Sequence, residues 1–208
     1  WKEAFAAEVP PLILEKMIGL SYEASVIVGM DGFGWMELIG PMYNVHENGI
    51  LRFSIDPAPI SDKETQALLS EARKIASWVS NIVDGYVWLL TIEFLIDKNG
   101  KIYFNEFAPR PHNSGHAGLD SRDNNQNHLW LGTVTGHVAQ KSQVKRSVVM
   151  ENILSQAELA DYYMQRKIVD ASGFYDYQKL SSEPNPINKD VRKLWHINHF
   201  WDEVEVWV

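Results

Sequence analysis

A chain of 208 residues, 45% of them hydrophobic and 22% charged, is long enough for one or two hydrophobic cores, and this composition excludes a disordered protein. The formal net charge of −8 argues against a general nucleic-acid binder, although local basic clusters could still hold one anionic small molecule. The absence of cysteine excludes disulfide scaffolds and thiolate metal sites, and no apolar run is long enough to span a membrane, so we expect a cytoplasmic protein.

The first residues, WKEAFAAEVPP, do not begin with methionine and lead directly into an apolar run, so we expect the chain to continue a longer protein. Two apolar strands are expected over residues 10–18 and 22–30, separated by Gly19. Further strands are expected across residues 35–55, broken by a Gly-Pro pair and an Asn-Gly pair.

From Ser61 the hydrophobic period changes to that of a helix. Ser61 is followed three residues later by Glu64, which is a capping box, and apolar residues then recur every three or four positions to about Val83. This pattern predicts one amphipathic helix. The next apolar runs, 87–96 and 101–107, are joined by Asp-Lys-Asn-Gly and predict a β-hairpin.

Beyond the hairpin, a polar stretch over residues 108–127 leads into a short helix that we expect to end before Gly132. The pattern then changes to that of a smaller, mostly-β unit, and we place the boundary between residues 1–143 and 144–208. The elements expected in the smaller unit are strands over 147–154, 173–180, 193–200 and 204–208 and a helix over 157–168.

The hairpin carries two carboxylates in an apolar setting. If Asn99 and Gly100 are the central residues of a type I′ turn, Glu93 and Glu106 occupy directly opposite positions, with Cβ atoms about 4.5–5.5 Å apart. Two like charges there are stable if one carboxyl keeps its proton or if a cation bridges them. Hard oxygen ligands suit Mg²⁺, or Mn²⁺ in its place. The alternative is a slipped register that leaves both carboxylates solvated at the sheet edge.

A loop rich in hydrogen-bond donors follows the hairpin in the stretch NEFAPRPHNSGH. Pro109 and Pro111 keep this loop out of the sheet, because proline has no backbone N–H. The pattern indicates an anion such as bicarbonate, carboxylate or phosphate held beside a metal ion, and an inert turn-rich loop is the alternative. The candidate donors are Arg110, His112, Asn113, Ser114 and His116.

These residues carry a resemblance to a known family. The segment IEFLIDKNGKIYFNEFAPRPHNSGH resembles the metal and anion segment of 5-(carboxyamino)imidazole ribonucleotide synthetases, ATP-grasp enzymes of purine biosynthesis. LILEKMIGLSYEASVIV and VHENGILRFSIDPA are similar to preceding parts of that family, and VMENIL, FYDYQK and VRKLWHINHF resemble its C-terminal domain more weakly. The resemblance implies an α+β fold. Residues 1–143 would be the second half of an ATP-grasp domain, an antiparallel sheet with helices, and residues 144–208 a small C-terminal mostly-β domain. The N-terminal domain and the first part of the ATP-grasp domain would precede the chain.

The resemblance also implies roles for individual residues. Adenine and ribose of ATP would be bound by Glu15, Lys16, Ile18 and Glu23. The two Mg²⁺ ligands would be Glu93 and Glu106. Bicarbonate and the ribonucleotide with its phosphate would be held by Arg110, His112, Asn113, Ser114, Lys179, Arg192 and Lys193. The stretch 117–136 departs from the family's helix, which carries Gln and Arg, and we expect drifted surface there rather than a new function. Gln178 and Trp195 also depart from the family, which has glycine at both positions.

The reaction implied by the resemblance begins with transfer of the γ-phosphoryl group of ATP to bicarbonate, giving carboxyphosphate. The carboxyl group then goes to the exocyclic amine of aminoimidazole ribonucleotide, and ADP and phosphate leave. His112 would either handle a proton or only position other groups. Members of this family are commonly dimeric, so the resemblance implies a homodimer.

Two alternatives to this reading are another ATP-grasp carboxylase or ligase and a truncated nucleotide-binding fragment without activity. No glycine-rich phosphate loop occurs between Trp1 and Val208, so we expect the chain alone to bind ATP weakly and not to turn it over.

Overall fold

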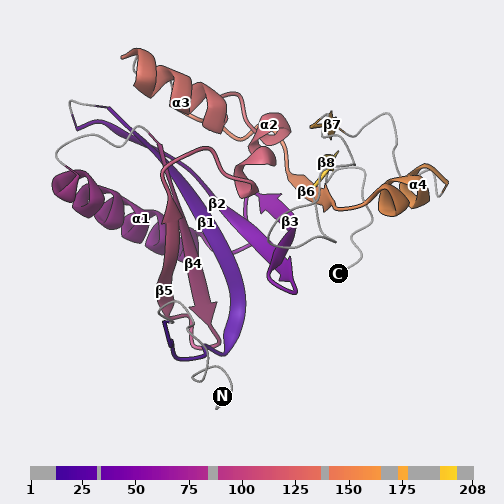
Figure 1. Cartoon of the computed structure of the whole chain (residues 1–208). Coiled ribbons are helices and arrows are strands. Elements are labelled where there is room, and N and C mark those ends of the chain that lie inside the picture. The colour runs from indigo at the N-terminus through magenta and orange to yellow at the C-terminus, as the bar shows by residue number, and fades with distance from the viewer. Residues whose placement is uncertain are drawn as a thin grey trace, which may run out of the picture.

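Eight strands form one antiparallel sheet in the order β5-β4-β1-β2-β3-β6-β8-β7 (Figure 1). The computed structural model describes residues 13–31, 34–83, 89–136, 141–164, 173–177 and 193–200. The mixed α+β class and the antiparallel sheet expected from the sequence are confirmed. The strands are β1 (Leu20–Met30), β2 (Met36–Glu47), β3 (Ile50–Asp56), β4 (Leu89–Asp97), β5 (Ile102–Ala108), β6 (Val148–Ile153), β7 (Gly173–Asp176) and β8 (Trp195–Phe200).

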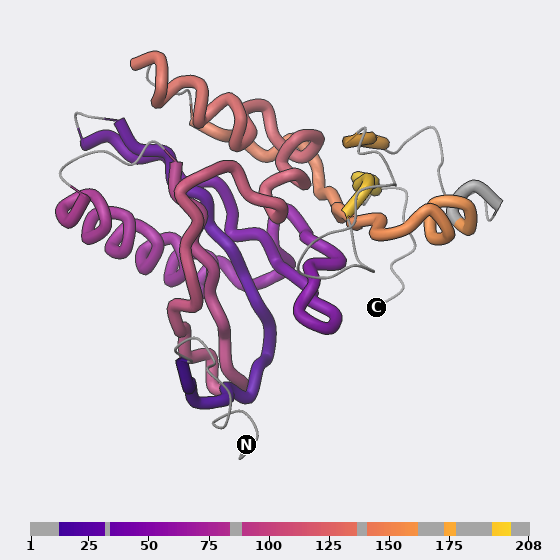
Figure 2. The backbone as a smooth tube through the Cα atoms, viewed as in Figure 1, coloured from indigo at the N-terminus to yellow at the C-terminus, as the bar shows by residue number. Residues whose placement is uncertain are grey.

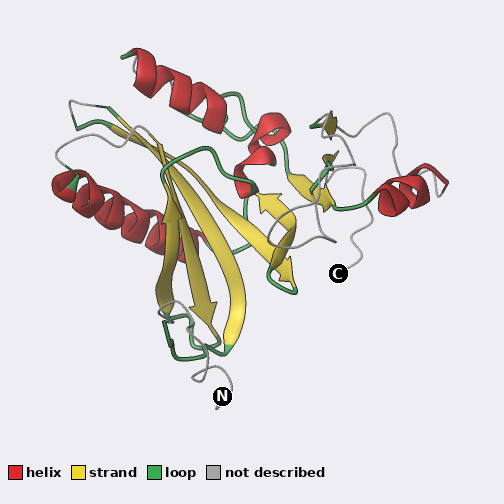
Figure 3. Cartoon of the chain, in the orientation of Figure 1, coloured by secondary structure: helices red, strands yellow, loops and turns green. Residues whose placement is uncertain are grey.

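Helices cover both faces of this sheet (Figure 3). One face carries the long helix α1, and the other carries the short helices that follow β5. The helix expected to end before Gly132 instead runs to Thr135. It stops at Gly136, whose left-handed φ of 69° terminates a helix readily. The helices are α1 (Asp62–Ile82), η1 (Ser114–His116), α2 (Gly118–Ser121), α3 (Gln126–Thr135) and α4 (Gln156–Met164).

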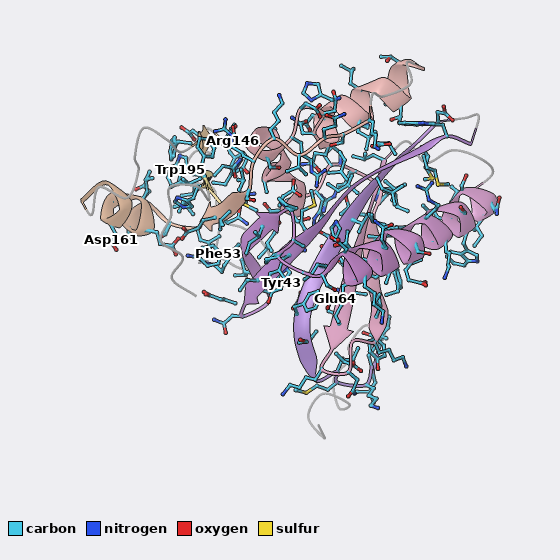
Figure 4. All side chains as sticks on the ribbon, turned by 180° about the vertical axis from the view of Figure 1, so that it is seen from behind. Tyr43, Phe53, Glu64, Arg146, Asp161 and Trp195 are labelled. Carbon is cyan, nitrogen blue, oxygen red and sulfur yellow. The ribbon has the colours of Figure 1, made fainter. Side chains whose placement is uncertain are left out.

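The start of α1 is fixed by the capping box predicted from the sequence. The Ser61 hydroxyl accepts a hydrogen bond from the Glu64 N–H, and the Glu64 carboxylate accepts one from the Ser61 N–H at 3.0 Å. Glu64 also accepts a hydrogen bond from the Tyr22 hydroxyl at 3.3 Å. Figure 4, seen from behind, shows Glu64 on α1 close to Tyr43, which stacks on Tyr22. The cap therefore also ties the helix to the sheet.

Ser61→Ala is expected to lower the free energy of unfolding by about 1 kcal/mol, because the Glu64 N–H loses its acceptor. Chemical denaturation of the variant and the parent chain measures the change. Gln66→Ala, on an exposed position of the same helix, serves as the control and should leave the midpoint nearly unchanged. A Ser61→Ala chain as stable as the parent would contradict the cap.

Hydrophobic cores lie on both faces of the sheet. Against α1, the buried residues Leu68, Ala72, Ala76 and Val79 pack on apolar side chains of β1 and β4. On the other face Leu129 of α3 packs against Ile27, Ile39, Met42 and Leu89. α3 approaches β1 closely, because a Cβ added to Gly29 would lie only 2.4 Å from Leu129 Cγ. The second core thus fixes α3 and, with it, the loop that precedes α3.

Two turn predictions have opposite outcomes in β2. The Asn-Gly turn is confirmed: Asn48 and Gly49 both have positive φ, 52° and 76°, as a two-residue type I′ hairpin requires. The break expected at the Gly-Pro pair is wrong, since β2 continues through Gly40 and Pro41. The register between β1 and β2 shifts there, so the strand takes up the proline as an irregularity and does not end.

The prediction of a strand over residues 10–18 is wrong for residues 13–18, the part that the structure describes. Residues 13–19 form no regular element, and β1 begins at Leu20. Figure 2 shows this segment running beside the turn between β4 and β5, where the Lys98 N–H reaches the carbonyl of Gly19 at 3.4 Å. Apolar composition alone does not make a strand here, because Ile13, Leu14 and Met17 are 80–93% exposed.

The elements expected in the smaller unit are confirmed where they are described. β6, α4, β7 and β8 fall on the predicted segments, while the strand at 204–208 lies outside the described residues. β6 pairs with β3 over four positions, so the sheet is continuous across the boundary that we proposed at residue 143. No helix among the described residues is long and apolar enough to cross a membrane.

Candidate functional site

A row of polar side chains crosses the sheet face that lies away from α1. Ser25 lies opposite Glu93 in the ladder between β1 and β4. Asn44 lies opposite Glu23 on one side and Ser54 on the other. Since residues opposite each other share a face, these five side chains point to the same side of the sheet. We call Glu23, Ser25, Asn44, Ser54 and Glu93 the polar row.

The turn and register of the hairpin decide which residues of β5 lie opposite Glu93. The turn between β4 and β5 is not the predicted type I′ turn on Asn99 and Gly100. It is a three-residue loop in which Gly100 has φ 77° and its N–H bonds to the Asp97 carbonyl at 2.9 Å. This loop shifts the register by one residue near the turn.

A bulge in β5 then restores the register, because Ile92 pairs with Phe107 while Phe94 pairs with Phe104. Glu93 therefore faces two residues of β5, Asn105 and Glu106. The Glu93 side chain is 13% exposed, and Glu106 is exposed.

His112 of the donor loop holds the Glu93 carboxylate. Its Nε2 lies 2.9 Å from Glu93 Oε1, and both side chains are 13% exposed. Burial would raise the pKa of the Glu93 carboxyl, but the hydrogen bond and electrostatic attraction of His112 lower it, with smaller contributions from His46 and Asn105. The net pKa lies below the ordinary value for glutamate. Glu93 is therefore ionised at neutral pH.

The other ring nitrogen of His112, Nδ1, is linked to the polar row by a chain of hydrogen bonds. Asn44 Nδ2 donates to Ser25 Oγ at 3.0 Å, and Ser25 Oγ donates to Ser114 Oγ at 2.7 Å. Ser114 Oγ then lies 2.9 Å from His112 Nδ1. Because the ionised Glu93 carboxylate can only accept, Nε2 carries a ring proton toward it, while the Ser114 hydroxyl and the Ser114 N–H, at 3.4 Å, both lie at Nδ1. The donor loop is thus joined to the sheet by a continuous chain of hydrogen bonds.

Arg110 lies on the exposed side of this loop. Its guanidinium donates through Nη1 to the Pro111 carbonyl at 3.1 Å, and its own carbonyl accepts from Thr91 Oγ1 at 3.4 Å. The buried hydroxyl of Thr91 thereby fixes the backbone of Arg110, while the guanidinium faces outward.

The C-terminal part of the chain reaches the donor loop through Lys193. The Lys193 ammonium donates to Asn113 Oδ1, lies 3.2 Å from His116 Nδ1 and sits over the ring of Tyr177. Burial lowers the pKa of His116 to about 3, helped by the charge of Lys193 and by His112, so His116 is neutral at neutral pH. Two residues assigned to substrate binding, Asn113 and Lys193, are therefore in contact.

Aromatic stacking supports that contact. His196 lies between His116 and Tyr175, with ring centroids 4.8 Å and 4.4 Å away. The Tyr177 hydroxyl lies 2.9 Å from His116 Nδ1 and 2.5 Å from His196 Nδ1. Burial lowers the pKa of His196 to about 2, with contributions from His116 and Lys193. This part of the site is built from neutral rings around one ammonium group.

The residues assigned to adenine and ribose lie in the segment before β1 and in the first half of β1 itself. Glu15 and Lys16 are exposed, and Ile18 is half-buried, in the segment without regular structure. Glu23 is held by His46, whose Nδ1 lies 2.6 Å from Glu23 Oε2. Lys179 and Arg192 lie outside the described residues.

The expectation that residues 117–136 are drifted surface is wrong, because two of their polar side chains are buried and make specific contacts. Arg122 is 7% exposed and forms a buried ion pair with Asp56, and Gln126 is 1% exposed. Gln126 bonds to both backbone groups of His112. Neither contact has a local sequence signal, because the partners lie 66 and 14 residues away in the chain.

With this geometry in place, comparison with known proteins identifies the fold family. Residues 1–127 match the family model described as the ATP-grasp domain. The chain belongs to the ATP-grasp family. The match includes β1 to β5 and the donor loop, so the hairpin carboxylates and the residues around them lie inside the ATP-grasp domain.

Named relatives of this ATP-grasp chain are N5-carboxyaminoimidazole ribonucleotide synthases. The protein of Brucella melitensis is 35% identical over 152 residues, which are 73% of this chain and 41% of that protein. The protein of Staphylococcus saprophyticus is 30% identical over 145 residues, 69% of this chain and 37% of that protein. The chain thus spans about two fifths of the length of these relatives.

Solved structures agree with the sequence comparison. A crystal structure of an ADP complex of N5-carboxyaminoimidazole ribonucleotide synthetase has a TM-score of 0.79 and 30% identity, over 92% of this chain and 48% of that one. The synthetase from Staphylococcus aureus with ADP has a TM-score of 0.76 and 29% identity, over 91% of this chain and 48% of that one. The ATP-grasp fold expected from the sequence is confirmed.

The donor set of the ATP-grasp hairpin fits a hard cation. Glu93 is ionised, and the bulge puts it opposite Asn105 and Glu106, so two carboxylates and an amide share one face. Among the described residues, no group of three or more histidine, aspartate or glutamate side chains could hold a metal ion. Mg²⁺ commonly takes one or two protein carboxylates together with phosphate oxygens, so this sparse set is of the kind that it uses.

Proposed function

We propose that this chain is the part of an N5-carboxyaminoimidazole ribonucleotide synthetase that holds the metal ion, bicarbonate and the ribonucleotide. The enzyme transfers the γ-phosphoryl group of ATP to bicarbonate, giving carboxyphosphate and ADP. The carboxyl group then passes to the exocyclic amine of aminoimidazole ribonucleotide, and phosphate is released. The names of the relatives support this reaction, and the chain covers about two fifths of their length.

One observation carries the proposal above the others. The Lys193 ammonium reaches Asn113 and His116 in the same loop whose His112 holds Glu93. The basic group of Lys193, just before β8, therefore borders one site together with the donor loop and the hairpin carboxylates. A site of this kind brings a phosphate-bearing substrate, a small anion and a metal–nucleotide complex together, which is what a carboxylation driven by ATP requires.

Each group then has a defined task. Glu93 and Glu106 would hold Mg²⁺, which when bound neutralises charge on the nucleotide phosphates. Arg110 binds bicarbonate through its planar fork beside the γ-phosphate, and Asn113 and Ser114 complete the anion loop. The ribonucleotide and its phosphate are held by Lys179, Arg192 and Lys193, and ATP by Glu15, Lys16, Ile18 and Glu23.

The function is tested by phosphate release from the full-length protein that contains this chain. With ATP and Mg²⁺ present, bicarbonate should stimulate phosphate release, and aminoimidazole ribonucleotide should couple it to formation of the carboxyamino product. Phosphate release that is indifferent to bicarbonate would overturn the proposal. Sedimentation of the same protein tests the expected homodimer.

The carboxylate pair is tested by Glu106→Gln in the full-length protein. The variant should weaken Mg²⁺-dependent nucleotide binding by about tenfold or more, roughly 1.4 kcal/mol, because one metal ligand is lost. Its fold should stay intact or become slightly more stable, since Glu93 loses a like-charged neighbour across the bulge. Titration calorimetry with ADP at several Mg²⁺ concentrations measures the change.

The matched control for this test is Glu71→Gln, an equal change of charge on the exposed face of α1. It should leave Mg²⁺ and nucleotide affinity unchanged. Equal affinities in Glu106→Gln and the parent would remove Glu106 from the metal site.

A further inference from the structure

Gln126, the first residue of α3, directs both ends of its side-chain amide at one residue of the donor loop. Its Oε1 accepts from the His112 N–H at 2.8 Å, and its Nε2 donates to the His112 carbonyl at 2.9 Å. A side chain that satisfies both backbone groups of one residue acts as a strand partner would, and it fixes the backbone position of that residue.

Gln126 lies in a buried and closely packed position. The residue is 1% exposed. A Cβ added to Gly115 would lie 2.3 Å from Gln126 Oε1 and 2.5 Å from Ile27 Cδ1, so the glycine gives the amide its room. The position of Gln126 along α3 is set by the Asn125 cap, whose Oδ1 accepts from the N–H groups of Asn127 and His128.

The ring of His112 shows what this backbone clamp achieves. Nε2 lies 2.9 Å from Glu93 Oε1, and Nδ1 lies 2.9 Å from Ser114 Oγ. Ser114 belongs to the same loop as His112, whereas Glu93 belongs to β4. Both nitrogens therefore stay bonded at once only if the His112 backbone keeps its distance from the sheet. We propose that Gln126 is a positioning residue, which clamps the His112 backbone so that the imidazole orients the Glu93 carboxylate. Only the role of Glu93 toward Mg²⁺ rests on the proposed function.

The clamp is tested first in this chain by nuclear magnetic resonance. The His112 Nε2 proton, held by Glu93, should give a slowly exchanging ring signal, which Gln126→Leu should remove. Gln126→Glu keeps the acceptor for the His112 N–H and loses the donor, so its signal should be weakened but present. Asn127→Ala, at an exposed position beside it, should leave the signal unchanged. Leu129→Ala loosens the packing of α3 without touching His112 and should keep the signal at matched fraction folded.

The second measurement uses the full-length protein and Mg²⁺-dependent ADP binding. Gln126→Leu should weaken it by about 10–100-fold, the usual effect of losing a group that orients a metal ligand. In a His112→Ala background the same substitution should add nothing, because the clamp acts through that ring.

Several outcomes would overturn the clamp. They are a persistent ring signal in folded Gln126→Leu, the same loss of signal in Leu129→Ala, and an additive effect in the His112→Ala background. If Gln126→Leu does not fold, an unchanged signal in Gln126→Glu would also overturn it. If the parent protein shows no Mg²⁺-dependent binding, the proposed function fails, while the ring signal still decides whether Gln126 positions His112.

Discussion

Replacing Asp56 with alanine is expected to lower the free energy of unfolding by about 3–5 kcal/mol, the cost of leaving a buried charge without its partner. Asp56 is fully buried at the end of β3, and Arg122 follows α2. Arg122 Nε and Nη2 each donate to the carboxylate at 2.6 Å, and the Ser121 hydroxyl donates to the same group. In Asp56→Ala the guanidinium keeps its burial and loses its acceptors. Urea denaturation followed by circular dichroism measures the loss.

Two further variants separate the buried charge from the loss of volume. Asp56→Leu combined with Arg122→Met removes both charges and should recover much of the stability, since apolar replacements of buried pairs are often neutral or better. Glu71→Ala breaks the exposed ion pair with Lys74, 2.7 Å long, and should cost no more than about 0.5 kcal/mol. An Asp56→Ala chain no less stable than Glu71→Ala would show that the buried pair contributes nothing.

Local patterns predicted most of the fold. The capping box at Ser61 and the Asn48-Gly49 turn were confirmed because each depends on a few consecutive residues. Two of the failures, the strand over residues 10–18 and the type I′ turn of the second hairpin, share a cause. Residues 13–18 have the composition of a strand and no described partner strand beside them, and the Asp-Lys-Asn-Gly turn can close with two or three loop residues. Strand pairing determined the first outcome and loop closure the second, and amino-acid composition reports neither.

The candidate site likewise contains residues whose convergence the sequence predicts and residues whose contacts it does not predict. Glu93, Glu106 and the donor loop are neighbours in one hairpin and its exit, so their convergence could be predicted from the sequence alone. The bulge that places Asn105 as well as Glu106 opposite Glu93 could not, because it arises from the mismatch between the loop and the register of β5. The contact of Lys193 with Asn113 joins residues 80 apart, and only the family resemblance assigned both to one substrate. Gln126 had no signal, since a polar residue at a helix start usually faces solvent.

Arg110→Lys in the full-length protein is expected to cost about 2–4 kcal/mol of transition-state stabilisation, roughly 30- to 1,000-fold in kcat/KM for bicarbonate. The charge is kept, but under the proposed function the guanidinium would offer a planar fork to two bicarbonate oxygens, whereas lysine would offer only a point charge. The backbone of Arg110 is fixed by Thr91, so a lysine would start from the same place with a different reach. Arg73→Lys, exposed on α1, is the matched control and should leave turnover unchanged. Bicarbonate-dependent phosphate release reads the effect, and near-parental turnover in Arg110→Lys would show that bicarbonate is held by another group.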